Sequence, residues 1–294
     1  MKHTEPKISR RRFLKRCLIG GAALAVPADA ILYEPRAVEL TTHHVAVPNL
    51  PRERDGFRLV QLSDLHRRSL APDAAITSAV RIANSTRPDA AVLTGDFIHH
   101  NPDDIVPCFE MLSELKSTLG SYAVFGNHDH WTDAPAVAAA MKRHGVTLLD
   151  NANVELEKGL YLVGIDDKWG GRPDVPTSFR QVNRNSSHVI LSHTPLAVDL
   201  LKGRCGLLIT GHTHGGQINI PFVPRSCLPG LRGWKYISGW YRVDQMLMYV
   251  NRGIGMVNPP IRFLCRPEVT LFILHPASTG LPHLASARIN NPAS

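Results

Sequence analysis

Five short polar motifs, each following an apolar run of strand length, constrain this chain more than any other feature. The apolar runs are FRLVQLS, AAVLT, YAVF, HVIL and GLLIT. Because the carboxyl ends of the strands in an open α/β sheet meet at one crevice, we expect the motifs to lie close together. They are Asp64-Leu-His66, Gly95-Asp96, Gly126-Asn127-His128-Asp129, Ser192-His193 and Gly211-His212-Thr213-His214.

The side chains of these motifs indicate a metal centre. Mixed carboxylate, amide and imidazole ligands suit Mn, Fe or Zn better than Ca or Mg. Asp64 and His66 are two residues apart, so an extended segment places both on one face, and the same holds for His212 and His214. Two cations close together need an anion between them, and Asp96, on a Gly-Asp turn, is our candidate for that bridge.

The positive charge of the chain is concentrated at its N-terminus. The formal net charge is +8, but residues 1–30 hold seven Lys or Arg against two acids. The remainder carries 26 basic and 23 acidic residues, a net charge of +3. We therefore expect no stable nucleic-acid partner, which would need a strong basic surface.

Residues 1–30 are typical of a twin-arginine signal peptide. Ser9-Arg10-Arg11-Arg12-Phe13-Leu14-Lys15 matches the export signal. The apolar stretch 17–26 is shorter than the roughly 20 residues that span a bilayer, and Ala28-Asp29-Ala30 is a small-residue cleavage site. We expect the twin-arginine export machinery as a partner and the periplasm or the outer face of the cytoplasmic membrane as the location. A basic amphipathic anchor or an uncleaved leader is the alternative.

From residue 57 the chain alternates strand-like runs with helical stripes. This order predicts an α/β domain over 57–275 with largely parallel strands, after a connector and edge segment at 31–56 and before a disordered tail at 276–294. Residues 166–174 read as a rim loop, 216–241 as a long surface excursion, and 246–250 and 269–274 as strands. The helical stripes are Ile76/Ala79/Val80/Ala83, Ile105/Phe109/Leu112/Leu115 and Val137/Met141, the last opened by Asp133 and Pro135.

The motif order D-x-H, G-D, G-N-H-[DE], H, G-H-x-H resembles the signature of the calcineurin-like metallophosphoesterases, and the resemblance spans 57–275. The phrases GHTHGGQI, VNRGIG and PIRF…RPEVTLFIL resemble its twin-arginine-exported phosphodiesterase branch, which is itself similar to some UDP-2,3-diacylglucosamine hydrolases.

The resemblance implies a four-layer αββα sandwich holding two divalent metal ions. His128 would face the substrate and stabilise or protonate the departing alkoxide, and Asp129 would hydrogen-bond His128. The implied ligands are Asp64, His66, Asp96 and His214 for one metal, and Asp96, Asn127, His193 and His212 for the other.

We therefore expect an exported phosphoesterase that cleaves phosphodiester or phosphomonoester bonds with metal-activated hydroxide. Its substrate would be a phosphate ester, either lipid-linked or a nucleotide. One alternative is a UDP-2,3-diacylglucosamine-type pyrophosphatase or phospholipid-head-group hydrolase at the membrane surface. A second is a non-catalytic metal-binding envelope scaffold, which the complete ligand set disfavours.

The remaining polar and aromatic residues carry weaker signals. The aromatic-rich stretch 222–241 could grip a lipid, make a peripheral membrane contact or pack over the sheet edge. A solvated rim is favoured for His99 and His100 over contact with substrate or metal. His130-Trp131 is ambiguous. A structural role is favoured for His43, His44, His144 and His188, and no phosphate contact is assigned to any of Arg67, Arg68, Arg252 and Arg262. The cysteines after the leader, which show no zinc-knuckle spacing, are Cys108, Cys205, Cys227 and Cys265.

Overall fold

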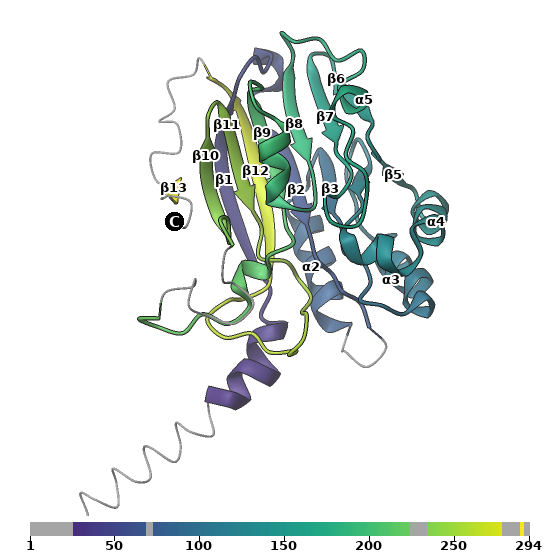
Figure 1. The fold of residues 1–294 in the computed structure, drawn as a ribbon, viewed down its shortest axis with the longest axis vertical. Helices are drawn as coiled ribbons and strands as arrows, with labels where there is room; N and C mark the ends of the chain where they lie inside the picture. The colour runs from purple at the N-terminus through teal and green to yellow at the C-terminus, as the bar shows by residue number, and fades with distance from the viewer. Residues whose placement is uncertain (1–25, 69–72, 224–233, 278–288, 291–294) are drawn as a thin grey trace, which may run out of the picture.

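Two β-sheets lie face to face in the computed structural model, which describes residues 26–68, 73–223, 234–277 and 289–290 (Figure 1). The first sheet has the order β1 (Glu39–Val47), β12 (Glu268–Pro276), β2 (Phe57–Leu62), β3 (Ala90–Thr94), β4 (Ser121–Val124), β5 (Val146–Leu148). The second has the order β13 (Ile289–Asn290), β10 (Gly239–Val243), β11 (Met246–Val250), β9 (Gly206–Thr210), β8 (Ser187–Leu191), β7 (Leu160–Gly164), β6 (Asn153–Glu157).

Parallel pairing dominates both sheets, as the sequence predicts. Strands β2 to β5 pair in parallel, and so do β7, β8, β9 and β11. Antiparallel pairs join β12 to β2, β10 to β11 and β6 to β7. The two strands predicted at 246–250 and 269–274 are present but belong to different sheets. Strand β11 lies in the second sheet and β12 in the first.

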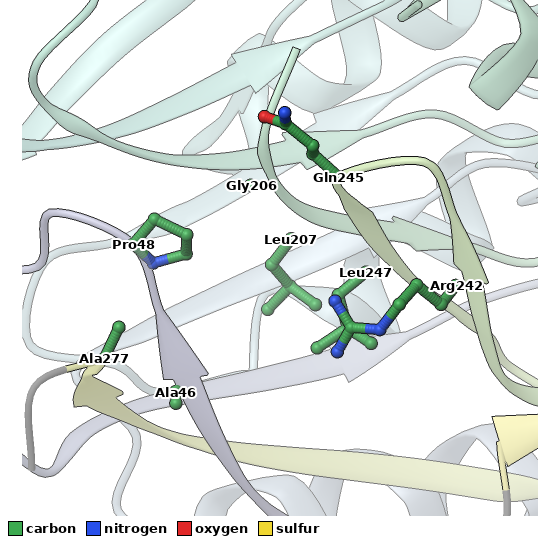
Figure 2. A pocket seen from close by; sticks show the side chains of 8 residues that line it. All are labelled: Ala46, Pro48, Gly206, Leu207, Arg242, Gln245, Leu247 and Ala277. Atoms are coloured by element: carbon green, nitrogen blue, oxygen red, sulfur yellow. The ribbon is translucent and has the colours of Figure 1, made fainter. Parts of the chain in front are cut away.

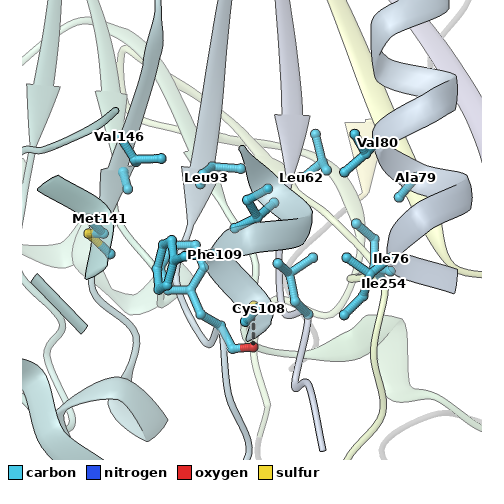
Figure 3. Close-up of a cluster of buried hydrophobic side chains, with 14 of the residues drawn as sticks. Leu62, Ile76, Ala79, Val80, Leu93, Cys108, Phe109, Met141, Val146 and Ile254 are labelled. Carbon is cyan, nitrogen blue, oxygen red and sulfur yellow. Dashed lines mark hydrogen bonds between the residues drawn. The ribbon is translucent and has the colours of Figure 1, made fainter. Parts of the chain in front are cut away.

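Helices cover the outer face of each sheet, which gives the expected four layers. Helices α2 (Ala74–Ser85), α3 (Ile105–Leu112) and α4 (Asn127–Arg143) pack on the first sheet through a core that includes Leu62, Leu93, Phe109 and Met141 (Figure 3). The outer face of the second sheet is covered by shorter pieces, the 3-10 helix η5 (Pro195–Leu200) and α5 (Val175–Ser178). Short helical turns complete the described chain: η1 (Asp29–Tyr33), η2 (Glu34–Arg36), η3 (Arg52–Arg54), η4 (Pro102–Asp104) and η6 (His214–Gly216).

The predicted helices are present with two differences at their ends. In α2, all four residues of the predicted stripe are buried. Helix α3 ends at Leu112, so Leu115 packs on the core from beyond the helix. Helix α4 begins at Asn127 rather than near Asp133, because the GNHD motif forms its first turn and Asp133 makes a kink with φ −165°.

One loop expectation is confirmed and the other is wrong in part. Residues 166–174 form a loop, as expected, although Asp166 and Asp167 at its start are buried. In the tail predicted to be disordered, residues 289 and 290 pair with β10, and 278–288 and 291–294 lie outside the described residues.

The N-terminal part of the described chain is fastened to the domain. Residues 26–36 are helical, and the carbonyl of Ala30 accepts a hydrogen bond from the Arg262 amide at 3.0 Å. The Glu34 carboxylate accepts the amides of Leu264 and Cys265. Among the described residues, no helix combines the length and apolar character needed to cross a membrane. Cys108, Cys205 and Cys265 are free thiols, and Cys227 lies outside the described residues.

A small cavity of about 80 Å³ lies at the end of the sandwich opposite the motifs (Figure 2). Its lining includes Gly206, the first residue of β9, whereas the G-H-x-H motif follows the last. This cavity is separate from the metal centre described below.

The core beneath α3 yields a stability prediction. Phe109 is fully buried, so Phe109→Ala should lower the free energy of unfolding by about 3–5 kcal/mol, through lost burial and a residual cavity. Val106 lies on the same helix and is 41% exposed, so Val106→Ala should change the free energy of unfolding by less than about 0.5 kcal/mol. Urea unfolding of both variants measures the difference, and equal losses would contradict this packing.

Candidate metal centre

The five motifs converge at the carboxyl ends of strands from both sheets. The first three motifs follow β2, β3 and β4 of the first sheet, and the last two follow β8 and β9 of the second. The centre therefore lies where the two sheets meet, rather than in the crevice of a single sheet.

Five of the predicted ligands have left-handed backbone conformations. The φ angles are +51° at Asp64, +42° at His66, +54° at Asp96, +71° at His212 and +51° at His214. Non-glycine residues rarely adopt this region, and such strained residues cluster at functional sites. The turns lead the chain off each strand end and hold these side chains in one place.

Glycines of the motifs let the backbone approach the carboxylates. A Cβ atom at Gly126 would lie 2.2 Å from Oδ1 of Asp96, and one at Gly211 would lie 2.2 Å from Oδ2 of Asp64. Any side chain at either position would displace a predicted ligand. Only glycine leaves room for the two carboxylates at these positions.

In the described part of the chain, three groups of candidate ligand atoms each lie within 4.8 Å, and two of them consist of predicted ligands, whereas the third comprises His66, His99 and His128. Of the two groups of predicted ligands, one comprises Asp64, His66 and His214, and the other Asp96, His193 and His212. Oδ2 of Asp96 is 3.2 Å from Nε2 of His66 and 3.1 Å from Nε2 of His193, so this carboxylate contacts both groups. The grouping agrees with the two ligand sets implied by the sequence resemblance.

The unpaired polar atoms at the centre fit metal ions. Buried donor or acceptor atoms normally have hydrogen-bond partners, and leaving one unpaired costs about 1–3 kcal/mol. Here three such atoms lie without a hydrogen-bond partner. They are Oδ1 of Asn127 and the Nε2 atoms of His212 and His214.

A second set of contacts fixes the ligands. The Nδ1–H of His193 donates to the Thr94 carbonyl at 2.7 Å, which directs Nε2 toward Asp96 and the predicted metal site. Burial of Asp96 favours its neutral form, but His193 and His66 outweigh burial and hold its pKa well below the usual range. The pKa of Asp64 is raised by its complete burial. Neutralising two buried carboxylates is a role that cations would fill.

Asp129 does not bond the His128 side chain, contrary to expectation. Its carboxylate instead accepts the backbone amides of Asp96 and Phe97 at 2.9 Å and of Gly126 at 2.8 Å. Burial, followed by the charge of Asp96, raises the pKa of Asp129 to about 7. Asp129 thus ties the G-D turn to the G-N-H-D turn, and the motif pattern alone does not distinguish the two roles.

His128 is held by His99 instead. Its Nδ1–H donates to the His99 carbonyl at 2.6 Å, so Nε2 is the ring nitrogen left for the adjoining cavity. The backbone amide of His128 also donates to Oδ1 of Asp96 at 2.8 Å. Burial lowers the pKa of His128 to about 4, so this imidazole is neutral near pH 7 when no substrate is bound.

His99 is a site residue that sequence reasoning placed on a solvated rim. It is half-buried, its ring stacks on His128 at 5.2 Å, and its Nδ1 lies 3.4 Å from Nδ1 of His66. One ring must donate to the other across that contact, which orients the His66 imidazole. Its neighbour His100 is exposed, as expected.

A cavity of about 570 Å³ opens from the centre, with Asp96, His128 and His212 in its lining. Three tryptophans form apolar walls: Trp131, Trp169 and Trp234. The rings of Trp169 and Trp234 stack at 6.2 Å, and both lie within 5.5 Å of the His212 ring. We refer to this space as the tryptophan cavity.

The loop predicted to lie on the rim builds one wall of the tryptophan cavity. The Asp167 carboxylate accepts the amides of Trp169 and Gly170 at 2.7 Å and so positions the indole. The adjacent residues His130 and Trp131 have different roles. His130 bonds Asp166 at 2.6 Å, whereas Trp131 lines the cavity and is 56% exposed.

The arginines near the centre are engaged within the protein. Arg67 pairs with Asp104 and Asp73, and Arg252 pairs with Glu268 and Glu39. Arg68 donates to the Met256 carbonyl and the Asn258 side chain. Arg262 is fully buried and donates to the carbonyls of Arg252, Gly253, Gly255 and Cys265. In the described structure, none of these four guanidinium groups is free of intramolecular partners.

The contact between His99 and His66 yields a prediction. His99→Ala should weaken metal binding by about 10–100-fold, the usual cost of losing a group that orients a ligand. His100→Ala is the matched control and should leave the metal affinity nearly unchanged, because His100 is exposed. Metal titration of the apo variants measures both affinities, and equal effects would show that His99 does not orient His66.

Comparison with known proteins places the motifs in a family. A family model described as calcineurin-like phosphoesterase matches residues 57–216. Metallophosphoesterase YkuE of Bacillus subtilis is 33% identical over 285 residues, which cover 91% of this chain and 98% of YkuE.

Two further relatives carry more specific names. Phosphodiesterase YaeI of Escherichia coli is 29% identical over 279 residues, covering 91% of this chain and 99% of YaeI. UDP-2,3-diacylglucosamine pyrophosphatase LpxG of Chlamydia muridarum is 28% identical over 296 residues, covering 81% of this chain and 89% of LpxG.

Proposed function

Because this chain belongs to the calcineurin-like phosphoesterase family, we propose that it is an exported, dinuclear metal-dependent phosphodiesterase. The observation that carries the proposal is the pair of donor groups in contact through Asp96, with unpaired ligand atoms beside a deep cavity. Convergence of all seven expected ligands argues against a non-catalytic scaffold.

The chain offers ligands for two ions of Mn, Fe or Zn. When bound, the ions would supply Lewis acidity to the phosphoryl group and lower the pKa of a water. Asp64, His66 and His214 would hold one ion and Asn127, His193 and His212 the other, with Asp96 shared between them.

His128 would assist the leaving group. Its Nδ1–H is committed to the His99 carbonyl, so Nε2 is the atom that can exchange a proton with substrate. A phosphate diester brings negative charge to this ring, which favours the protonated form that burial disfavours. Protonated Nε2 can then donate to the oxygen that departs from phosphorus.

The charge balance of the cavity favours a diester over a monoester. A monoester dianion presents terminal oxygens that are commonly bound by a free arginine. The four candidate arginines all have partners inside the protein, and the cavity walls are largely indole and aliphatic. A diester carries one charge and a second organic substituent, which such walls suit better.

The second candidate is a pyrophosphatase of the UDP-2,3-diacylglucosamine type, or a phospholipid-head-group hydrolase at the membrane surface. The name of the relative LpxG and the apolar cavity walls favour it. A panel of UDP-diacylglucosamine, glycerophospholipids and simple nucleotides, assayed with metal-loaded protein, separates these substrates by kcat/KM.

Two substitutions test the proposed roles. Asp96→Ala should remove both the metals and hydrolysis of bis-4-nitrophenyl phosphate, because the shared carboxylate is lost. His128→Ala should keep both metals and lower kcat by about 10²–10⁴-fold, the usual contribution of a general acid. Metal analysis alongside turnover distinguishes them. Full turnover with two metals in Asp96→Ala, or metal loss in His128→Ala, would contradict the assignments.

Export by the twin-arginine route to the periplasm or the outer membrane face rests on the leader sequence. Burial of Ala30 and the hydrogen bond of its carbonyl support a leader that stays attached after folding, since cleavage after Ala30 would break this contact. We propose that the retained leader supplies the peripheral membrane contact.

Replacing Arg10 and Arg11 by lysine tests this route. The full-length double variant should stay in the cytoplasmic fraction, whereas the wild type should reach the cell envelope with its leader attached. Cell fractionation and mass determination give both answers. Envelope recovery of the lysine variant would exclude twin-arginine export, and a wild-type mass without residues 1–30 would exclude retention.

A further inference from the structure

A second cavity borders the metal centre at His66. Its volume is about 340 Å³, and its lining includes Leu65, Ile254 and Met256. The rings of His66 and His214 lie 4.8 Å apart, and His214 lines the tryptophan cavity. The second cavity therefore lies against one predicted ligand of the centre, and the tryptophan cavity lies against others.

One loop separates the two cavities. Residues 257–259 line the tryptophan cavity, whereas residues 254–256 and 260 line the second. The loop is fixed from below by Arg262, which donates to the carbonyls of Gly253 and Gly255. Two fixed spaces on either side of a loop suit the two substituents of a phosphodiester, since a monoester has only one.

The chemistry of the two linings differs. The walls of the tryptophan cavity include flat indole rings. Among the described residues, the second cavity is lined mainly by aliphatic side chains, together with Asp73, His66 and three arginines, and His66 carries its only aromatic ring. The three arginines of this lining are engaged within the protein, since Arg67 pairs with acidic side chains, and Arg36 and Arg68 donate to backbone carbonyls. Such walls favour a flexible hydrocarbon chain over a sugar or a base.

The N-terminal segment supplies one wall of the second cavity. Ile31, Leu32 and Pro35 line it, although they lie well before the residues that match the family. The hydrogen bonds of Ala30 and Glu34 to residues 262–265 hold this segment in place. The wall is thus anchored by polar contacts and presents its apolar side chains to the cavity.

Apolar surface continues from this wall to the outside. Ile31 is 48% exposed, Leu32 60%, Tyr33 59% and the nearby Leu264 58%. Figure 1 shows this helical segment projecting from the motif-bearing end of the sandwich. A chain that leaves a lipid surface would meet these apolar side chains before it entered the second cavity.

We propose that the second cavity is the binding subsite for one acyl or alkyl chain of a lipid phosphodiester. The inference deepens the proposed phosphodiesterase function and rests on it for the identity of the group at the metals. The chain enters past Ile31 and Leu32 and lies against Ile254 and Met256, while the phosphate occupies the metal centre. The other substituent lies in the tryptophan cavity.

Binding of two phosphonates to the metal-loaded, full-length protein tests the subsite directly. Each methylene that leaves water for an apolar wall tightens binding by about fourfold, so octylphosphonate should bind at least about 50-fold more tightly than methylphosphonate. Isothermal titration calorimetry gives both constants without requiring turnover.

Three variants test whether the tighter binding of octylphosphonate arises in the second cavity. Ile31→Asp places a charge in the wall, and Ala75→Phe fills the cavity from the first turn of α2. Val106→Asp is the matched control, because Val106 is exposed to a similar degree on α3 and lines neither cavity. The octyl preference should fall at least about tenfold in the first two variants and persist in the control, with methylphosphonate affinity unchanged in all three.

The results separate the subsite from the function on which it rests. An octyl preference near one in the wild type, or one that survives both Ile31→Asp and Ala75→Phe, overturns the subsite. Failure of the wild type to hydrolyse methyl 4-nitrophenyl phosphate contradicts the proposed phosphodiesterase function instead, and the phosphonate ratio still decides whether the chain binds here.

Discussion

The carboxylate of Asp96 lies between His66 and His193, and the organisation of the molecule depends on that contact. Asp96 and His66 follow strands of the first sheet, whereas His193 follows a strand of the second. This buried anion therefore helps to join the two sheets at the end where the motifs meet. The bond from the His193 ring to the Thr94 carbonyl and that from the His212 amide to Asp64 cross the same boundary. Beyond these contacts, the sheets are joined by apolar burial together with buried polar bonds such as that from Gln61 to the Thr210 carbonyl.

This arrangement is costly for a chain that only needs to be stable. Ligand residues have left-handed backbone angles, histidine nitrogens lack partners, and two carboxylates are fully buried. Each of these features costs free energy, and natural proteins retain them mainly at functional sites. The apolar cores on either side of the first sheet stabilise the scaffold that maintains the strained turns. Binding of two cations would offset much of the cost, because the same atoms that lack partners are the expected ligands.

Sequence patterns predicted the strands and ligands well because both follow from local rules. Apolar runs of strand length ended where predicted, and His66, His193 and His214 converged as their motifs indicated. Contacts between side chains distant in sequence were not predictable in this way. Asp129 has carboxylate chemistry suited to either a histidine or backbone amides, and only the fold decides between them. His99 lies at the site because the segments after β3 and at the start of α4 place it in contact with His128. The spacing of residues in the sequence does not indicate this contact.

The central claim is that two metal ions share Asp96 at the junction of the sheets. Anomalous diffraction from crystals of the metal-loaded protein tests it most directly, since it locates each ion independently of activity. The account predicts two peaks about 3.5–4 Å apart, with one oxygen or both oxygens of Asp96 within bonding distance of both. A single peak, or two peaks of which only one contacts Asp96, would contradict the account.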